Sequence, residues 1–473
     1  MNIKTRLAPS PTGYLHIGSL RTALYNYFFA KKNHGTFLLR IEDTDRTRYV
    51  EGSVEALLKT LKQMHLSWDE GPYVQSERLP IYQEHAQMLL EKGSAYYCFC
   101  TPERLKELRE RQQQVKQSTK YDRHCLSLST DEIQKRLAAG ESHVIRLKIP
   151  DGITTFEDAI RGSITINNEE IDDQVLMKSD GFPTYHLAVV VDDHLMGITH
   201  IIRAEEWISS VPKHVHLYQS FGWDLPVFAH LPLVLNPDKS KLSKRQGDVA
   251  VEDYLAKGYL PEALINYVAL LGFNPTADRE IYKMDELIEL FDLSKVNKSG
   301  AVFDVQKLRW MNGQYLRAMD LDALVSASKN FLTNDEVVTD EMLKKILTVE
   351  VERLEVLSEV SDRVRPYLSI SDYDASILVW KKSTREDVQA QLQGLSGLVG
   401  SFSPSVFENV SLIEHAIKQY IESKSLQNGN VLWPLRVALS GSEQSASPFQ
   451  LAWVLGKDET LSRLTIALNK LSA

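Results

Sequence analysis

The stretch Pro9-Ser10-Pro11-Thr12-Gly13-Tyr14-Leu15-His16-Ile17-Gly18 decides the fold expected for the first part of the chain. It follows the alternating run Ile3 to Leu7, typical of a strand, and precedes apolar residues on one helical face, Leu20, Ala23, Leu24, Tyr27 and Phe28. The pattern therefore predicts a strand, a turn and a helix. N–H groups at such a helix start favour an anion such as triphosphate, and Gly18 lets the backbone approach it closely. His16 is placed to donate to a phosphate oxygen.

A second segment, Lys241-Leu242-Ser243-Lys244-Arg245, puts three cations and a hydroxyl group in five residues. The loop-forming sequences Asn236-Pro237-Asp238 and Gln246-Gly247 flank it. Cations above a polyphosphate stabilise the charge that develops during phosphoryl transfer. A basic pentapeptide in a loop is more often only a solvated surface, so this segment alone is weak evidence. The two segments taken together indicate an ATP site.

Up to about residue 255, strand-like and helix-like segments alternate, which indicates βαβ units. In open parallel sheets, ligands bind beyond the carboxyl ends of strands, where Glu42, Asp43 and Asp45 follow a predicted strand. A charged helical stretch followed by short strands indicates an insertion between about residues 91 and 180. The strands predicted after the first are Thr36 to Ile41, then Val144 to Ile149 and Ser163 to Asn167 in the insertion, then Tyr185 to Asp192 and His200 to Arg203.

Beyond about residue 255 the spacing of apolar residues becomes mainly helical. Pro261 is expected to open a helix, and Ser411 with Glu414 matches a capping box. The composition, 43% hydrophobic and 25% charged over 473 residues, suits a soluble protein of several domains. The start lacks an apolar signal core and no apolar run is long enough to span a bilayer, so we expect a cytoplasmic protein. The net charge of −9 decides little about nucleic acid, because binding depends on local basic faces.

The two segments resemble the HIGH-like and KMSKS-like signatures of class I aminoacyl-tRNA synthetases, here His-Ile-Gly-Ser and Lys-Leu-Ser-Lys-Arg. Ser19 and Arg245 depart from the ideal strings, and both variants occur in the glutamate-specific branch. The chain is similar to bacterial glutamyl-tRNA synthetases over essentially its whole length. The further matching stretches are 6–13, 40–45, 182–188, 191–194, 202–207, 303–304, 307–313 and 434–439.

This resemblance implies a multidomain fold with a Rossmann-type α/β catalytic domain and mainly α-helical C-terminal anticodon-binding domains. The implied domains are two catalytic halves at 1–90 and 184–255, an α+β insertion that binds the tRNA acceptor end at 91–183, a helical stem-contact domain at 256–320, and two helical anticodon-binding subdomains at 321–375 and 376–473. The implied partners are tRNA(Glu), L-glutamate and ATP, and the family is usually monomeric. Rival functions are a nucleotidylyltransferase, a glutaminyl-tRNA synthetase with β-barrels, a truncated relative that modifies a tRNA base, and a non-catalytic tRNA-binding module.

The implied reaction passes through glutamyl-adenylate, requires bound tRNA for glutamate activation, and needs no side-chain nucleophile. Magnesium is expected to arrive with the nucleotide. The implied catalytic residues are His16, Gly18, Lys241, Ser243 and Lys244. The implied ATP-binding residues are Pro11, Thr12, Gly13, His16, Gly18, Glu206 and Lys244.

Glutamate carries two carboxylates and one ammonium, so its pocket needs a cation for the side chain and an acid for the amine. Arg6 and Arg203 are the candidates for the side chain, with Tyr185 as a hydroxyl donor, and Glu42 is the candidate for the ammonium. An isolated arginine is more often part of an ordinary ion pair, but each of these residues lies in a matching stretch. The other residues expected in or near this pocket are Ala8, Ser10, His186, Glu205 and Glu206.

All three cysteines, Cys98, Cys100 and Cys125, lie in the predicted insertion. Disulfides are rare in cytosolic proteins, whereas clustered thiolates suit a structural zinc ion with four ligands. Zinc-bearing members of the resembled family use Cys-x-Cys followed by a Tyr/Cys or Cys/His pair. Tyr121 or His124 is therefore the candidate fourth ligand, and Ser127 stands where some relatives have histidine. Free thiols in an insertion without metal remain the alternative.

The resemblance also places at Arg353 the position where an arginine or a glutamine separates strict from relaxed enzymes. Leu354, Leu357 and Val360 have helical spacing, which predicts that Arg353 lies on the polar side of a helix. It is a candidate anticodon-binding residue that reads the third anticodon base. A surface ion pair with Glu350 or Glu352 is the alternative, and whether glutamine tRNA is also charged stays open.

Overall fold

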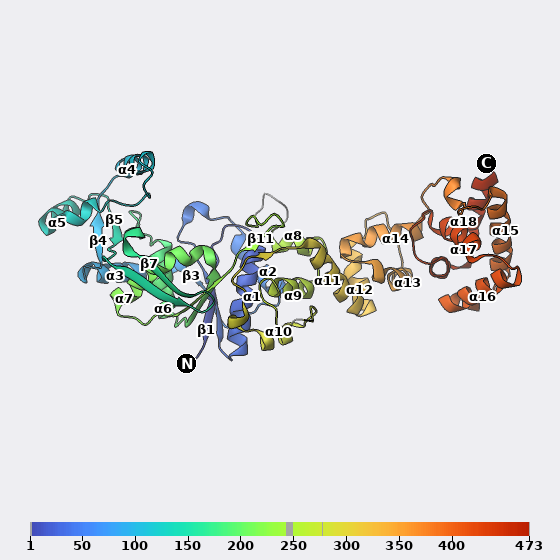
Figure 1. Ribbon diagram of the computed structural model, residues 1–473, viewed down its shortest axis with the longest axis horizontal. Helices are drawn as coiled ribbons and strands as arrows, with labels where there is room; N and C mark the ends of the chain where they lie inside the picture. Colours follow the sequence, from blue (N-terminus) through green and yellow to red (C-terminus); the bar gives the residue numbers. More distant parts are fainter. Residues whose placement is uncertain (1, 243–248, 277, 473) are drawn as a thin grey trace. The chain divides into compact units, whose positions relative to one another are not determined.

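The computed structural model describes residues 2–242, 249–276 and 278–472 and divides into two compact units (Figure 1). Unit 1 comprises Met1–Ala256 and Pro261–Leu308, and unit 2 comprises Lys257–Leu260 and Arg309–Ala473. Every strand of the described residues belongs to unit 1, whereas the described part of unit 2 consists of helices and turns. The expected combination of an α/β part and a mainly helical C-terminal part is confirmed. The finer domain boundaries remain predictions.

The described residues of unit 1 form four small sheets. Their strand orders are β1-β2-β3, β7-β6-β10-β9, β4-β5-β8 and β11-β12. The strands are β1 (Lys4–Leu7), β2 (Thr36–Ile41), β3 (Glu70–Val74), β4 (Ala95–Cys98), β5 (Val144–Leu147), β6 (Ile153–Asp158), β7 (Gly162–Asn167), β8 (Val175–Met177), β9 (His200–Ala204), β10 (Val227–Leu231), β11 (Val234–Leu235) and β12 (Ala301–Val302).

The first two sheets meet edge to edge at the start of the chain. Lys4 in β1 donates its backbone N–H to Thr199 Oγ1 at 2.9 Å, and the Thr199 N–H donates to the Lys4 carbonyl at 3.0 Å. β1, β2 and β3 are parallel, as are β9 and β10, and β2 is buried along nearly its whole length. Burial of both faces is expected of parallel strands covered by helices. The carboxyl ends of β1, β2 and β9 therefore open toward one region.

The helices of unit 1 pack on these sheets or on one another (Figure 1). They are α1 (Ile17–Lys32), α2 (Ser53–Gln63), α3 (Leu79–Glu91), α4 (Pro102–Gln114), α5 (Thr130–Ala138), α6 (Tyr185–Leu195), α7 (Val211–Phe221), α8 (Val251–Ala256), α9 (Pro261–Ala269) and α10 (Met284–Leu290), and α11 (Val305–Ala318) spans the boundary of the units. The strand predicted for Tyr185 to Asp192 is wrong, because this segment is α6. Residues 187–193 are all buried, and α3 and α7 share a core with this helix. When a helix is buried on all sides, its sequence is a continuous apolar run, and this pattern cannot be distinguished from that of a buried strand.

Unit 2 contains seven further α-helices in its described part. They are α12 (Leu321–Ser328), α13 (Asp340–Glu350), α14 (Val360–Leu368), α15 (Arg385–Ser401), α16 (Val410–Ser423), α17 (Asn428–Ser440) and α18 (Pro448–Ser472). Arg463 of α18 is fully buried and donates to the carbonyls of Pro366, Tyr367 and Leu439, so it ties α18 to α14 and α17.

The capping box predicted at Ser411 and Glu414 is wrong, although the helix is present. α16 begins at Val410, and the Asn409 side chain accepts from the Ser411 N–H at 2.8 Å, so Asn409 is the cap. Glu414 instead pairs with Lys418 one turn later. None of the helices in the described ranges is long and apolar enough to cross a bilayer.

Candidate active site

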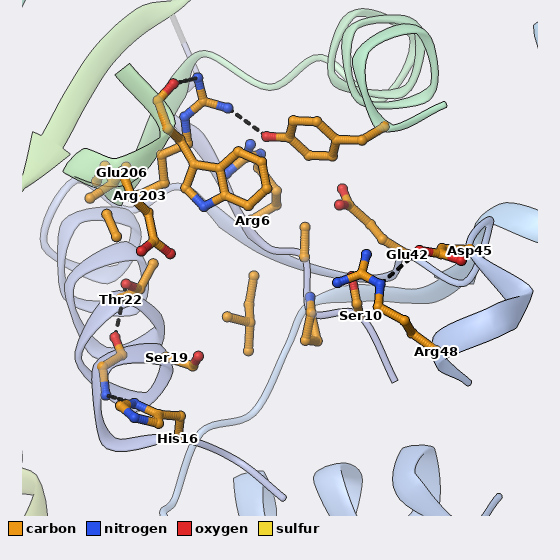
Figure 2. Close-up of a pocket in the computed structure, with 18 of the residues that line it drawn as sticks. Arg6, Ser10, His16, Ser19, Thr22, Glu42, Asp45, Arg48, Arg203 and Glu206 are labelled. Atoms are coloured by element: carbon orange, nitrogen blue, oxygen red, sulfur yellow. Dashed lines mark hydrogen bonds and ion pairs between the residues drawn. The ribbon is translucent and has the colours of Figure 1, made fainter. Parts of the chain in front are cut away.

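A cavity of about 790 Å³ lies beyond the carboxyl ends of β1, β2 and β9 (Figure 2). Ten residues predicted from sequence line it: Arg6, Ala8, Ser10, His16, Gly18, Glu42, Tyr185, Arg203, Glu206 and Lys241. Pro11, Thr12 and Gly13 are not among its lining residues. Ser243 and Lys244 lie outside the described residues.

His16 ends the turn after β1 and starts α1. Its backbone is extended (φ −73°, ψ 144°), and its Nδ1 accepts a hydrogen bond from the Gly18 N–H at 2.9 Å, so His16 is the N-cap of the helix. Gly13 in the same turn has φ 127°, a region open chiefly to glycine. Because Nδ1 is an acceptor, a neutral His16 has its proton on Nε2. The Nε2–H group can therefore donate a hydrogen bond.

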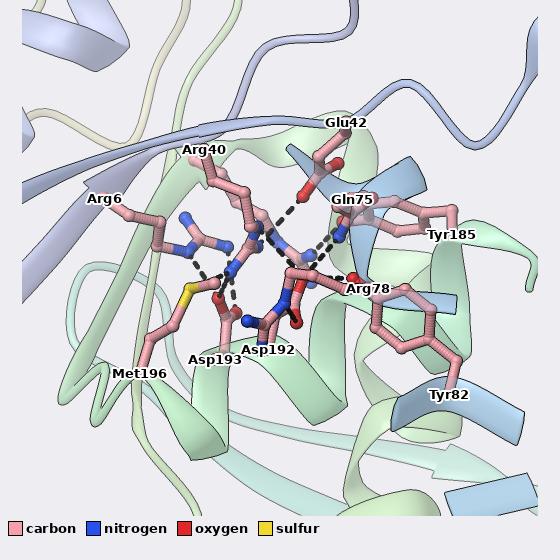
Figure 3. A network of polar contacts seen from close by, with 11 residues as sticks. Arg6, Arg40, Glu42, Gln75, Arg78, Tyr82, Tyr185, Asp192, Asp193 and Met196 are labelled. Atoms are coloured by element: carbon pink, nitrogen blue, oxygen red, sulfur yellow. Dashed lines mark hydrogen bonds and ion pairs between the residues drawn. The ribbon is translucent and has the colours of Figure 1, made fainter. Parts of the chain in front are cut away.

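Arg40, fully buried at the centre of a polar network, holds two of the predicted pocket residues in place (Figure 3). Its Nη2 is 3.0 Å from Glu42 Oε1, and its Nη1 is 2.8 Å from Asp193 Oδ1. Arg6 makes a two-point contact with the same Asp193, at 3.1 and 3.2 Å. Burial lowers the pKa of Arg40, but the carboxylates of Asp193, Glu42 and Asp192 outweigh it, and the net pKa is raised.

The second aspartate of α6 completes this network. Asp192 accepts from Gln75 Nε2 at 2.9 Å, Arg78 Nε at 2.9 Å and the Tyr82 hydroxyl at 2.7 Å. The guanidinium groups at positions 6, 40 and 78 thus face the carboxylates at positions 42, 192 and 193, and these charges balance. Sequence reasoning named Arg6 and Glu42 as ligand-binding groups but missed that each already has a partner.

Arg203 differs from the other pocket arginines. Its side chain donates to the Tyr185 hydroxyl at 2.6 Å, to His230 Nε2 at 3.1 Å and to the Trp207 carbonyl at 3.3 Å. In the described part of the chain, these hydrogen-bond partners are all uncharged. Burial, which leaves the residue 6% exposed, lowers the pKa of its guanidinium. Arg203 is therefore a buried cation in the cavity wall that lacks a carboxylate contact among the described residues.

Two ion pairs lie at the rim of the cavity. Lys241 pairs with Glu206, which connects the second predicted ATP segment to the turn after β9. Arg48 pairs with Asp45 at 2.7 Å (Figure 2). Both pairs are substantially exposed. Surface pairs of this kind contribute little to stability.

His186 and Glu205, which sequence reasoning placed near the site, do not line the cavity. The His186 Nδ1 is 3.2 Å from His214 Nε2, and burial lowers the pKa of His186 to about 3. Glu205 pairs with Arg161 and accepts from the Leu233 N–H at 2.8 Å.

Comparison with known proteins identifies the family. Residues 2–310 match the family described as tRNA synthetases class I (E and Q), catalytic domain, and residues 319–468 match an anticodon binding domain. The glutamate–tRNA ligase of Clostridium botulinum (strain Hall) is 46% identical over 484 residues, which cover 100% of this chain and 99% of that protein. The chain belongs to the glutamate–tRNA ligase family. The glutamate–tRNA ligase of Chloroherpeton thalassium is 49% identical over 502 residues, which cover 99% of this chain and 98% of that protein.

A solved structure agrees with this assignment. The crystal structure of a glutamate–tRNA ligase from Elizabethkingia meningosepticum, in complex with its amino acid, is 38% identical, has a TM-score of 0.91, and covers 100% of both chains. The glutamate–tRNA ligase family combines a class I catalytic domain with an anticodon-binding domain, and both matches are present here. A nucleotidylyltransferase or a truncated relative without the second domain does not explain this match.

The three cysteines converge in the insertion as a metal site requires. The Sγ atoms of Cys98, Cys100 and Cys125 lie within 4.8 Å of one another, and those of Cys100 and Cys125 are 3.5 Å apart. The Tyr121 hydroxyl lies 3.3 Å from Sγ of both Cys98 and Cys100. Ligand sulfurs around a tetrahedral zinc ion stand roughly 3.8 Å apart. The Tyr121 hydroxyl is thus a fourth donor atom beside the three sulfurs, while His124 is exposed and outside this cluster.

Arg353 lies beside a second cavity of about 690 Å³, within unit 2. The single helix predicted around it is wrong, because short 3-10 turns at Val351–Arg353 and Leu357–Glu359 are joined by extended residues. The Arg353 Nη2 is 2.6 Å from Glu350 Oε1, so the ion pair considered as the alternative is present. The cavity is lined by Arg309, Trp310, Gln314, Arg317, Glu352, Arg353, Glu355, Glu359 and Arg363.

Proposed function

We propose that this chain joins L-glutamate to tRNA(Glu) in an ATP-dependent reaction that passes through glutamyl-adenylate and serves protein synthesis. Family membership over the full length supports the reaction class. Arg203 is the observation that supports the choice of amino acid. A cation that is buried in a cavity wall, with uncharged described partners, favours a ligand that brings its own carboxylate.

In this proposal the glutamate side-chain carboxylate binds against Arg203 and the Tyr185 hydroxyl, which stay hydrogen-bonded to each other. Arg6, which also lines the cavity, adds positive charge, although Asp193 offsets it. Glu42 receives the ammonium group, and Ala8 and Ser10 line the same turn. Burial raises the pKa of Glu42, while Arg40 counteracts this effect. An incoming ammonium further favours the ionised form of Glu42.

ATP is proposed to bind at the start of α1, with its phosphates near His16, Gly18 and Lys241 and with Mg²⁺ carried by the nucleotide. Ser243 and Lys244, outside the described residues, are assigned to the phosphates from sequence, as are the turn residues 11–13. Glu206, which lies at the rim of the cavity, is also assigned to nucleotide binding.

The proposed reaction has two balanced steps. The α-carboxylate of glutamate attacks the α-phosphorus of ATP, and the bond to the β-phosphate breaks to release pyrophosphate. A ribose hydroxyl of the terminal adenosine then attacks the activated carbonyl, loses its proton, and AMP leaves. No protein nucleophile takes part, so the chain contributes positioning and charge stabilisation.

The charging reaction itself tests this proposal. Labelled glutamate, ATP, Mg²⁺ and tRNA(Glu) transcript should yield aminoacyl-tRNA, whereas aspartate should not be attached. Failure to charge tRNA(Glu) with glutamate would overturn the proposal. From the family we also infer a monomeric, cytoplasmic enzyme, and sedimentation analysis of the purified chain tests the first of these.

We further propose one structural zinc ion held by the three cysteines and Tyr121. Protein purified without chelator should contain about one zinc per chain by elemental analysis. Tyr121→Phe should lose zinc more readily than the wild type, and the matched variant His124→Ala should retain it. Because the chain has no other cysteine, a thiol titration reports on this site alone. Three reactive thiols in a metal-free, fully active protein would support the free-thiol alternative.

Arg353 is proposed to read the third anticodon base. Its fixed fork of donors suits the acceptor edge of cytosine, whereas guanine of glutamine tRNA presents a donor there. The surrounding cavity offers Trp310, 41% exposed, and the guanidinium groups of Arg317 and Arg363 to an unstacked base and its phosphates.

Arg353→Gln should therefore relax the selectivity for glutamate tRNA over glutamine tRNA by about 1–3 kcal/mol while glutamate activation stays intact. Charging assays with both transcripts measure this change. Glu350→Gln is the matched control, because it breaks the same ion pair but keeps the arginine. Equal selectivity in Arg353→Gln and the wild type would show that Arg353 only forms a surface ion pair and does not read the anticodon. Efficient charging of glutamine tRNA by the wild type would show that the enzyme is non-discriminating.

A further inference from the structure

Asp158, His230 and Arg203 form a continuous hydrogen-bonded chain behind the proposed glutamate pocket. They come from β6, β10 and β9, three neighbouring strands of one sheet. His230 and Arg203 are register partners, so their side chains lie on the same face of the sheet. The side chains of Asp158 and His230 are fully buried, and neither residue lines the cavity.

The donors and acceptors along this chain determine the state of His230. The Arg203 Nε is always a donor and lies 3.1 Å from His230 Nε2, so Nε2 must accept. His230 is therefore neutral, with its proton on Nδ1, and this N–H donates to Asp158 Oδ2 at 2.6 Å. Burial lowers the pKa of His230, and the charge of Arg203 acts in the same direction, although the bond to Asp158 opposes them.

Asp158 is itself fixed by the backbone. Its Oδ1 accepts from the N–H groups of Ile160 at 3.0 Å and Arg161 at 2.9 Å, in the turn between β6 and β7. These contacts leave Oδ2 directed at His230. The turn thus holds the carboxylate, the carboxylate holds one ring tautomer, and the ring offers one acceptor to Arg203.

Fixing Nε of an arginine fixes the plane of its guanidinium group, because the group is rigid and planar. In Arg203 the terminal nitrogens also donate to the Tyr185 hydroxyl and the Trp207 carbonyl. One N–H on each terminal nitrogen then remains beyond these three hydrogen bonds. Two such donors in one plane match the two oxygens of a carboxylate.

We propose that Asp158 and His230 are positioning residues that orient Arg203 and thereby set the selectivity for an acidic amino-acid side chain. This inference rests on the proposed function of Arg203 as the carboxylate reader. Neither residue touches the substrate in this account. Sequence reasoning named neither of them.

Asp158→Asn is the sharpest test. Asparagine keeps an acceptor oxygen for the backbone N–H groups but turns the group at Oδ2 into a donor. His230 must then accept on Nδ1 and place its proton on Nε2, facing the Nε–H of Arg203. The KM for glutamate in tRNA-dependent pyrophosphate exchange should rise about tenfold to a hundredfold, while the KM for ATP stays unchanged.

Two variants of the histidine separate positioning from folding. In His230→Gln the amide oxygen can accept from Arg203 and the amide N–H can donate to Asp158, so the KM for glutamate should stay near the wild-type value. His230→Leu offers neither group and should behave like Asp158→Asn. His216→Gln is the control, because His216 is also buried and contacts Thr154 of the same strand β6 at 2.8 Å, away from the pocket.

The tautomer gives a readout that does not depend on activity. Spectra of ¹⁵N-histidine-labelled protein should show His230 protonated on Nδ1 in the wild type and on Nε2 in Asp158→Asn. A wild-type proton on Nε2, or an unchanged KM for glutamate in Asp158→Asn and His230→Leu, would overturn the inference. Wild-type protein that shows the Nδ1 tautomer but never activates glutamate would instead refute the proposed function, and with it the assigned role in selectivity.

Discussion

Arg203→Ala should weaken glutamate binding by about 2–5 kcal/mol, the range for truncating one partner of a buried charge pair. This corresponds to roughly 30-fold to several-thousand-fold in affinity. The reason is that Arg203 has only uncharged described partners, so the bound carboxylate loses the cation assigned to it. The KM for glutamate and for glutamine in tRNA-dependent exchange measures both the loss and the change in preference.

The control for this variant is Arg279→Ala, which removes an exposed arginine that pairs with Glu286 outside the cavity. It should leave the KM for glutamate unchanged. An Arg203→Ala enzyme with wild-type glutamate affinity and undiminished rejection of glutamine would remove Arg203 from the pocket.

His16→Asn should slow adenylate formation by about 10²- to 10³-fold, the usual cost of losing one transition-state donor. Asparagine is a good N-cap, so its side chain can still accept from the Gly18 N–H as His16 Nδ1 does. The variant lacks only the group at Nε2. Single-turnover formation of glutamyl-adenylate, with ATP near saturation, measures the effect.

His16→Ala separates the two roles of this residue. It should show the same loss of rate but also a lower free energy of unfolding, by about 0.5–2 kcal/mol, because the cap is gone. Near-normal adenylate formation in His16→Asn, with a strong loss in His16→Ala, would mean that His16 acts only as the cap of α1.

Part of the cavity lining could be predicted from the sequence because these residues lie in short contiguous stretches. Arg6, Ser10 and His16 surround one strand-turn-helix junction, and local periodicity is enough to place that junction beyond a strand end. Glu42 follows a strand in the same way, and both strands are parallel neighbours. The location of these residues at the strand ends therefore follows from local structure.

The charge partners could not be predicted, because they depend on tertiary contacts. Asp193, which holds both Arg6 and Arg40, is far from either in sequence, and the strand predicted from the sequence ends one residue before it, at Asp192. In a strand, Asp192 and Asp193 would point to opposite faces, whereas in α6 both reach the same network. His230 and Asp158 were missed for the same reason, since register across β6, β10 and β9 brings them to Arg203.

In unit 2 the short-range patterns were less reliable. Leu354, Leu357 and Val360 are buried, as a helical stripe predicts, yet two short turns rather than a helix place them there. At the cysteine cluster, the resemblance left Tyr121 and His124 open as the fourth ligand, and the proposal of Tyr121 rests on its hydroxyl, which lies 3.3 Å from two of the thiols.

Pyrophosphate exchange into ATP, measured with and without tRNA(Glu), tests the central claim most directly. The account predicts exchange that requires L-glutamate and bound tRNA and that aspartate and glutamine do not support at the same concentration. Exchange that glutamine supports as well as glutamate would contradict the role given to Arg203. No exchange with glutamate and tRNA(Glu) in folded protein would contradict the proposed function as a whole.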